Sequence, residues 1–204
     1  MCKIARYLKK NSTFTDAELE SISLDTSLSK ASISRQQEFL RGRWCAQQAL
    51  LELGDTSPVL RAKDRSPIWP MGFVGSISHN KEYSGAFVAL DKYYRSVGMD
   101  IEEIGRIKPE MKKMILSSTE QQRFVEQKEM TIIFSAKESL YKLLYPLVKE
   151  FFGFQDAEIT HLERGKFTIL LLKNLGEFSS GTRFQGSYEL LDGHILTQME
   201  LLHP

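Results

Sequence analysis

The residues best suited to chemistry are three carboxylates and two lysines in two short segments of the chain. The first segment, residues 96–102 (SVGMDIE), is expected to be a strand, because apolar and polar residues alternate along it. On such a strand, Asp100 and Glu102 project to the same side, and the apolar residues project to the opposite, buried side. The two acids can therefore share one metal ion.

The second segment, residues 134–142 (FSAKESLYK), is expected to lie on a helix from about residue 131 to residue 146. Glu138 and Lys142 are four positions apart, so they are adjacent on one helix face. Lys137 falls within the apolar stripe of the helix, and its amine must reach water or meet an anion. Each pattern alone is also typical of a solvated sheet face or a surface ion pair. In combination they favour a site for a metal ion and phosphate groups.

Length, charge and cysteine content exclude several classes of protein. The 204 residues are enough for one large or two small domains. Lys and Arg number 27 and Asp and Glu number 26, so the net charge of +1 predicts no broad attraction to nucleic acid or to a membrane surface. Cys2 and Cys45 lack metal-ligand spacing, which is typical of free thiols in a reducing compartment. No secretory leader or membrane-spanning stretch is visible, and we expect a cytoplasmic protein.

The first part of the chain is expected to form one long helix and three strands. The helix covers about residues 34–53, with Gly54 as its stop signal. The strands are expected at residues 73–79, 84–90 and 96–102. In an antiparallel meander, Ser78 and His79 would end at the same sheet edge as the two acids of the third strand, about 10 Å away.

The second part is expected to hold further helices and then strands. Helical stretches at residues 109–116 and 118–128 precede the helix that carries Glu138, and the spacing of Ser117 and Glu120 predicts a capping box. Residues 157–202 alternate as strands, with a hairpin turn at Asp192-Gly193.

Five motifs occur in one order between about residues 35 and 145. They are residues 39–46 (FLRGRWCA), 65–70 (RSPIWP), 75–79 (GSISH), 97–102 (VGMDIE) and 134–142 (FSAKESLYK). In these motifs the chain resembles the Sfp-type 4'-phosphopantetheinyl transferases, and within them the branch associated with enterobactin-like siderophore synthesis.

This resemblance implies an α+β fold of two similar halves, related by a pseudo-twofold axis, each with helices packed on a mostly antiparallel sheet. The N-terminal half, residues 1–102, would hold a coenzyme A-binding helix, a cationic loop and the three-strand meander. The C-terminal half, residues 103–204, would hold the catalytic helix, carrier-facing helices and the last strands.

The resemblance also implies a Mg2+-dependent enzyme that transfers the 4'-phosphopantetheine arm of coenzyme A to a serine of an apo carrier protein and releases 3',5'-ADP. Asp100, Glu102 and Glu138 would hold Mg2+, which prefers a few carboxylates together with phosphate oxygens and water. Glu138, or alternatively Glu102, would accept the proton of the serine. Lys142 would stabilise charge on the transferring or departing phosphate.

Several side chains are implied to contact coenzyme A. At its diphosphate these are Ser78, His79, Asp100, Lys137 and Lys142. Arg43, Lys63 and Arg65 are the candidates for its doubly charged 3'-phosphate. The carrier would be a peptidyl, aryl or acyl carrier of non-ribosomal peptide, siderophore, polyketide or fatty-acid synthesis, and a monomer would suffice.

Two other functions fit the same residues. One is a Mg2+-dependent phosphohydrolase or nucleotidyl transferase, since these carboxylates and lysines suit other diphosphate substrates. The other is a non-catalytic carrier-binding domain, in which the acids and lysines form only ion pairs. Incubation with coenzyme A, Mg2+ and an apo carrier separates the three.

Overall fold

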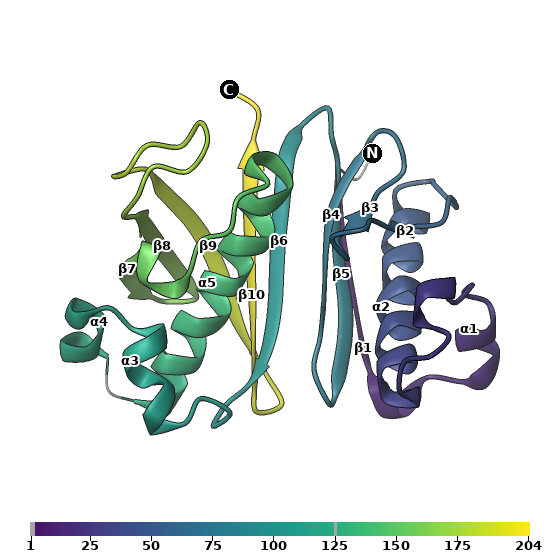
Figure 1. Cartoon of the computed structure of the whole chain (residues 1–204), viewed down its shortest axis with the longest axis horizontal. Coiled ribbons are helices and arrows are strands. Elements are labelled where there is room, and N and C mark those ends of the chain that lie inside the picture. The colour runs from purple at the N-terminus through teal and green to yellow at the C-terminus, as the bar shows by residue number, and fades with distance from the viewer. Residues whose placement is uncertain (1–2, 125) are drawn as a thin grey trace. The chain divides into compact units, whose positions relative to one another are not determined.

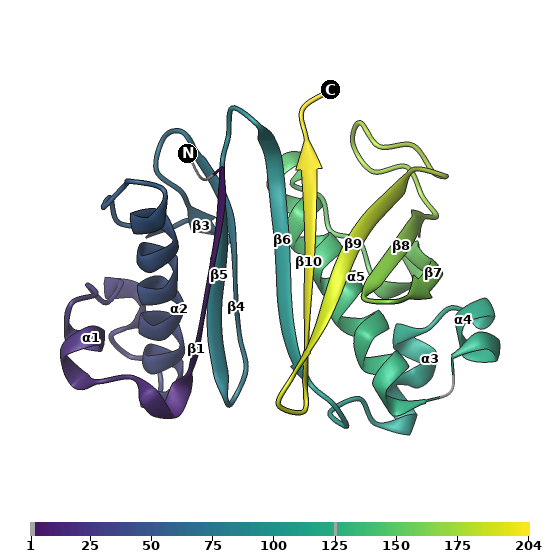
Figure 2. The same ribbon diagram turned by 180° about the vertical axis from the view of Figure 1, so that it is seen from behind.

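The computed structural model describes residues 3–124 and 126–204 and divides the chain into two compact units. The first unit comprises Met1–Val97 with Leu202–Pro204, and the second comprises Gly98–Leu201. Each unit combines helices with a β-sheet (Figures 1 and 2), and the expected α+β class is confirmed. The sequence-based boundary after residue 102 leaves both acids of residues 96–102 in the first half, whereas this division assigns them to the second unit.

The sheet of the first unit has the strand order β1-β5-β4, and α2 packs on it. Its main elements are β1 (Ile4–Lys10), α2 (Ile33–Glu52), β4 (Phe73–His79) and β5 (Tyr83–Leu90). Its shorter elements are the 3-10 turns Asn11–Thr13 and Thr26–Leu28, α1 (Asp16–Glu20), β2 (Leu60–Arg61) and β3 (Pro67–Ile68). Small and aliphatic α2 residues such as Ala46 and Ala49 are fully buried against the sheet, which lets the helix approach closely.

The ends of α2 follow local rules. The side chain of Ser32 accepts a hydrogen bond from the Arg35 amide at 3.3 Å, which caps the first turn. At the other end Gly54 has φ of +88°, a left-handed conformation that glycine adopts without strain. The helix therefore lies within one residue of its expected position, and the stop at Gly54 is confirmed.

The expected meander of three strands is wrong. β5 pairs with β4 on one edge and with β1 on the other, in register from Ile4 opposite Ala89 to Lys10 opposite Tyr83. β6 (Tyr94–Glu103) instead pairs with β10 in the sheet of the second unit. Seven consecutive β5 residues are buried, so this strand needs a partner on both edges, and the first strand of the chain supplies one. The separation of about 10 Å between Ser78–His79 and the two acids was inferred from this meander, so it no longer applies.

The sheet of the second unit has the strand order β6-β10-β9-β8-β7, and the long helix α5 crosses one of its faces (Figures 1 and 2). The remaining elements are a 3-10 turn (Pro109–Met111), α3 (Lys112–Ile115), α4 (Ser118–Arg123), α5 (Gln127–Val148), a 3-10 turn (Phe154–Asp156), β7 (Ala157–Glu163), β8 (Lys166–Leu171), β9 (Arg183–Leu191) and β10 (His194–Leu202). The core between them consists of apolar side chains such as Leu140, Leu144 and Phe167.

Two local predictions for this unit are confirmed. Ser117 and Glu120 form the capping box at the start of α4, each side chain accepting the backbone N–H of the other. Asp192 and Gly193 join β9 to β10 with φ of +44° and +79°, the pair of positive values that a two-residue hairpin turn requires. Of the helices in the described part of the chain, none is long and apolar enough to cross a membrane.

Gly98 allows α5 to lie directly on β6. A Cβ atom at this position would be 2.1 Å from the backbone oxygen of Ser139, far inside van der Waals contact. Because the clash is with backbone, no side-chain rotation relieves it. This close approach brings Lys142 of α5 within hydrogen-bond distance of Asp100 on β6.

Candidate active site

The two chemically suggestive segments meet in the second unit. Asp100 and Glu102 lie two positions apart on β6 and are both buried. From α5, the amine of Lys142 donates to Asp100 Oδ1 at 2.7 Å and to the Met99 carbonyl at 3.1 Å. The pairing of a strand that carries the acids with a helix that carries the lysine is therefore as the sequence indicates.

Electrostatic coupling ties Glu138 to the same group. Burial, followed by the charge of Asp100, raises the pKa of Glu102 to about 7 from its usual 4.5. The same two causes, again with burial first, raise the pKa of Glu138. Glu102 and Glu138 are therefore both poorly solvated, and the charge of Asp100 acts on each of them.

Two cations offset this repulsion. Lys142 pairs with Asp100, and Arg106 forms an ion pair between its Nη1 and Oε2 of Glu102. Arg106 also lowers the pKa of Glu138 by its charge, although 55% of its own side chain is exposed. Arg106 was not among the residues expected at the site, and the only signal for it in the sequence is a cation four residues after the second acid.

The donor chemistry of this group fits a hard divalent cation. Such ions prefer carboxylate oxygens, and a bound cation would offset the burial and the charge of Asp100 that raise the pKa of Glu102 and Glu138. Over residues 3–124 and 126–204, no three carboxylate, imidazole or thiol groups are placed to ligate one ion together. Lys142 and Arg106 are positive charges that pair with two of these carboxylates, Asp100 and Glu102.

Lys137 lies elsewhere than expected. Its amine meets an anion, but that anion is the buried Glu120, 2.7 Å away. The other two hydrogens of the ammonium are donated to the carbonyls of Ile115 and Phe154, each at 2.9 Å. Burial lowers the pKa of Lys137, and the charge of Glu120 opposes that shift. With all three hydrogens used inside the protein, the amine is not presented to a phosphate.

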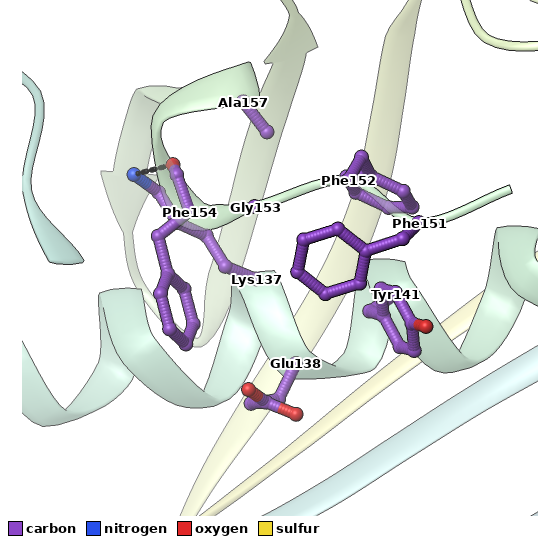
Figure 3. Close-up of a pocket in the computed structure, with 8 residues that line it drawn as sticks. All are labelled: Lys137, Glu138, Tyr141, Phe151, Phe152, Gly153, Phe154 and Ala157. Atoms are coloured by element: carbon purple, nitrogen blue, oxygen red, sulfur yellow. Dashed lines mark hydrogen bonds between the residues drawn. The ribbon is translucent and has the colours of Figure 1, made fainter. Parts of the chain in front are cut away.

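An aromatic pocket opens beside Glu138 (Figure 3). Its volume is about 230 Å³, and it is lined by Lys137, Glu138, Tyr141, Phe151, Phe152, Gly153, Phe154 and Ala157. Tyr141 stacks on Tyr145 with ring centroids 5.3 Å apart, and on its other side it contacts Phe152 at 5.3 Å. These aromatic residues were not among those expected at the site. The available signal is an aromatic run, Phe-Phe-Gly-Phe, directly after the helix and outside any periodic element.

The other residues expected at the coenzyme A phosphates, which are Arg43, Lys63, Arg65, Ser78 and His79, lie in the first unit. Ser78 is buried and His79 half-buried at the end of β4, and His79 Nε2 lies 3.4 Å from the Arg35 guanidinium. Lys63 and Arg65 are exposed on the turn between β2 and β3.

Arg43 is a buried cation rather than a surface arginine. One of its nitrogens donates to the Leu60 carbonyl at 2.9 Å, and its guanidinium lies 4.9 Å from the centroid of the Phe39 ring. Its Nε is buried and has no hydrogen-bond partner among the residues that the structure describes. Burial, followed by the charge of Arg61, lowers the pKa of Arg43 to about 10. The charge of Asp25, whose Oδ1 lies 3.9 Å from Arg61 Nη1, partly opposes this shift.

Comparison with known proteins agrees with both units. Residues 24–89 match the family described as 4'-phosphopantetheinyl transferase N-terminal domain, and residues 96–197 match the 4'-phosphopantetheinyl transferase superfamily. The 4'-phosphopantetheinyl transferase Npt of Nocardia iowensis is 32% identical over 187 residues, covering 83% of this chain and 84% of the relative. PptT of Mycobacterium tuberculosis, with the same enzyme name, is 32% identical over 188 residues, covering 85% and 82%. Enterobactin synthase component D of Salmonella typhi is 34% identical over 152 residues, covering 71% and 63%.

Proposed function

This chain belongs to the 4'-phosphopantetheinyl transferase superfamily and is an enzyme that transfers the phosphopantetheine arm of coenzyme A to carrier proteins, and we propose that it does so with Mg2+ held at Asp100, Glu102 and Glu138. The observation that carries the proposal is the group of carboxylates on β6 and α5, in which burial and then the charge of Asp100 raise the pKa of both Glu102 and Glu138. The bound cation would supply the positive charge that an attack on a diphosphate requires. The products are the holo carrier and 3',5'-ADP.

Glu138 is the proposed proton acceptor for the serine of the carrier. It lines the aromatic pocket and is half-buried, so an approaching hydroxyl can reach it. Its pKa is raised toward neutral pH, and a general base works best when its pKa lies near the pH of the reaction. Glu102 is the alternative base, but its carboxylate is paired with Arg106.

Lys142 is the proposed stabiliser of charge on the phosphate oxygens. The side chain of Lys142 is 26% exposed, so a phosphate can approach the amine while the amine stays near Asp100. A charged hydrogen-bond donor that faces developing negative charge lowers the barrier to phosphoryl transfer.

The aromatic pocket beside Glu138 is the proposed place for the pantetheine arm. The arm is a slender chain of methylenes and amides, and apolar rings with a few polar groups suit such a ligand. A volume of about 230 Å³ is enough for part of the arm rather than for the whole of coenzyme A. The reacting diphosphate would then lie outside the pocket, near the carboxylates.

Residues of the first unit are proposed to bind the phosphates of coenzyme A. The buried Arg43, with an unused N–H, is suited to the 3'-phosphate, and Lys63 and Arg65 add positive charge from the neighbouring hairpin. Ser78 and His79 are the proposed donors to the diphosphate.

The relatives named enterobactin synthase component D favour a carrier used in siderophore synthesis. We therefore propose a carrier of non-ribosomal peptide or siderophore assembly as the acceptor, with polyketide and fatty-acid carriers as further candidates. Coenzyme A and a newly made apo carrier are the two substrates, which assigns the reaction to the cytoplasm. A single chain carries all the proposed residues, so a monomer is the proposed active form.

The test is incubation of the protein with coenzyme A, Mg2+ and an apo carrier, followed by intact-mass analysis. The carrier should gain one phosphopantetheine and an equal amount of 3',5'-ADP should appear. Glu138→Gln should abolish the mass gain, while Glu103→Gln, a change at an exposed neighbour of the acids, should leave it intact. Cleavage of coenzyme A without a carrier would instead identify a phosphohydrolase, and binding without transfer a carrier-binding domain.

A further inference from the structure

The buried ammonium of Lys137 joins three separate parts of the second unit to α5. It donates to the Ile115 carbonyl at the end of α3, to the Glu120 carboxylate on α4 and to the Phe154 carbonyl in the 3-10 turn after α5. The side chains of Lys137 and Glu120 are only 2% and 0% exposed. Figure 3 shows the amine directed at the Phe154 carbonyl and away from Glu138.

Glu120 extends the same network to β7. Its Oε1 accepts the amide of Ile159 at 2.6 Å, next to an irregularity in the β7–β8 pairing. Its Oε2 accepts the amide of Ser117 at 2.7 Å as well as the Lys137 amine. Each oxygen of the buried carboxylate therefore has a donor, as a low-dielectric interior requires.

Stability alone is a poor explanation for this pair. A buried ion pair gains little over a well-packed apolar pair, because both charges lose their hydration. What the pair does provide is a set of directional contacts, since the Lys137 ammonium donates three hydrogen bonds and the Glu120 oxygens accept from two backbone amides. α3, α4 and the turn Phe154–Asp156 contain four, six and three residues, too few to hold a position by themselves.

We infer that Glu120 and Lys137 are positioning residues for the aromatic pocket, and hence for the pantetheine arm of coenzyme A. The inference rests on the proposed function. Lys137 and Phe154 both line the pocket, and the hydrogen bond between them fixes the separation of its two walls beside Glu138. The Phe154 ring also packs on Phe134, one turn earlier on α5, at 5.2 Å between centroids.

Loss of the Glu120–Lys137 ion pair should displace Phe154 at the pocket. Contacts with the pantetheine arm should weaken, and contacts with the nucleotide should not. The nucleotide end of coenzyme A does not depend on this pocket. A variant should therefore bind coenzyme A less tightly and bind 3',5'-ADP, which has no arm, as well as before. A general loss of structure would weaken both ligands equally.

The test uses the double variant Lys137→Met/Glu120→Gln in the full chain. Either single change would strand the other charge in the interior and risks an unfolded protein. In the double variant, methionine keeps the apolar stem that lines the pocket. Glutamine keeps one carbonyl oxygen to accept from the Ile159 amide, whereas the Ser117 amide loses its acceptor because an NH2 group takes the place of Oε2. Lys128→Met, at an exposed position on the same helix, is the matched control.

Thermal unfolding would first establish that the double variant is folded, and calorimetry would then measure both ligands. The expected result is a loss of coenzyme A affinity of roughly tenfold to a hundredfold, typical of a displacement of about 1 Å, with 3',5'-ADP affinity within about twofold of the wild type. A folded double variant with unchanged coenzyme A affinity, or with equal losses for both ligands, would overturn the inference. Wild-type protein that binds neither ligand would instead refute the proposed function.

Discussion

Replacing Glu102 by glutamine should stabilise the metal-free protein at alkaline pH. The carboxylate is buried near Asp100, and these two causes raise its pKa to about 7. An ionised Glu102 is therefore less favourable in the folded chain than in the unfolded one, where its pKa returns to 4.5. Glutamine has nearly the same shape and can accept the hydrogen bond of Arg106 without a charge.

The sign and the size of the effect follow from the two pKa values. Between pH 4.5 and pH 7 the folded state holds more protons than the unfolded state, so the contribution of Glu102 to stability falls as the pH rises through that window. Above pH 7 the cost is complete, and a shift from 4.5 to about 7 corresponds to about 3 kcal/mol at most. Because Arg106 is half exposed, solvent screens the site, and we expect about 1–2 kcal/mol.

Urea unfolding followed by far-ultraviolet circular dichroism measures this difference in EDTA. Glu102→Gln should be more stable than the wild type at pH 8 and equal to it near pH 4.5. Saturating Mg2+ should reverse the order at pH 8, since only the wild type keeps all three carboxylates. Glu103→Gln, at the exposed neighbouring position, should match the wild type throughout. Equal destabilisation of Glu102→Gln at every pH would refute the reasoning.

Three further outcomes are expected. Gly98→Ala should lower the free energy of unfolding in urea by about 3 kcal/mol, because its methyl group would lie 2.1 Å from the Ser139 carbonyl oxygen. Gly153→Ala, whose methyl group meets no atom closer than 4.0 Å, should unfold like the wild type. Lys142→Met should lower kcat by roughly 10²–10³-fold, because the phosphate loses a charged donor and Asp100 loses its partner; a change confined to KM for coenzyme A would contradict that role. Removal of divalent ions with EDTA should stop transfer and leave the circular dichroism spectrum unchanged, and activity that survives chelation would exclude the proposed metal dependence.

The site shows which contacts can be predicted from short-range sequence patterns and which cannot. Alternation along β6 predicts that Asp100 and Glu102 lie on one side of a strand, and the four-residue spacing predicts that Lys142 and Glu138 are adjacent on one face of α5. The hydrogen bond between Lys142 and Asp100 is known only from the structure. The anion that meets the Lys137 amine is Glu120, 17 residues earlier in the chain. No periodicity relates these two residues, so the sequence shows that a partner is needed without identifying it.

The sequence by itself determined the features that act over a few residues. These are the stop of α2 at Gly54, the capping box of α4 and the positive φ angles of the Asp192-Gly193 turn, each set by the side chain and backbone of near neighbours. Its five ordered motifs also identified the family.

Only the tertiary structure decided which distant segments meet. β1 occupies the edge of β5 that a meander would leave for β6, Arg106 pairs with Glu102, and the segment Phe151–Phe154 closes a pocket on α5. These choices depend on how whole elements bury their apolar faces and satisfy backbone hydrogen bonds, because contacts between distant residues are selected by the packing of the complete unit. The sequence therefore indicated which carboxylates to consider together, but it did not indicate the ion-pair partner Arg106 or the pocket on α5.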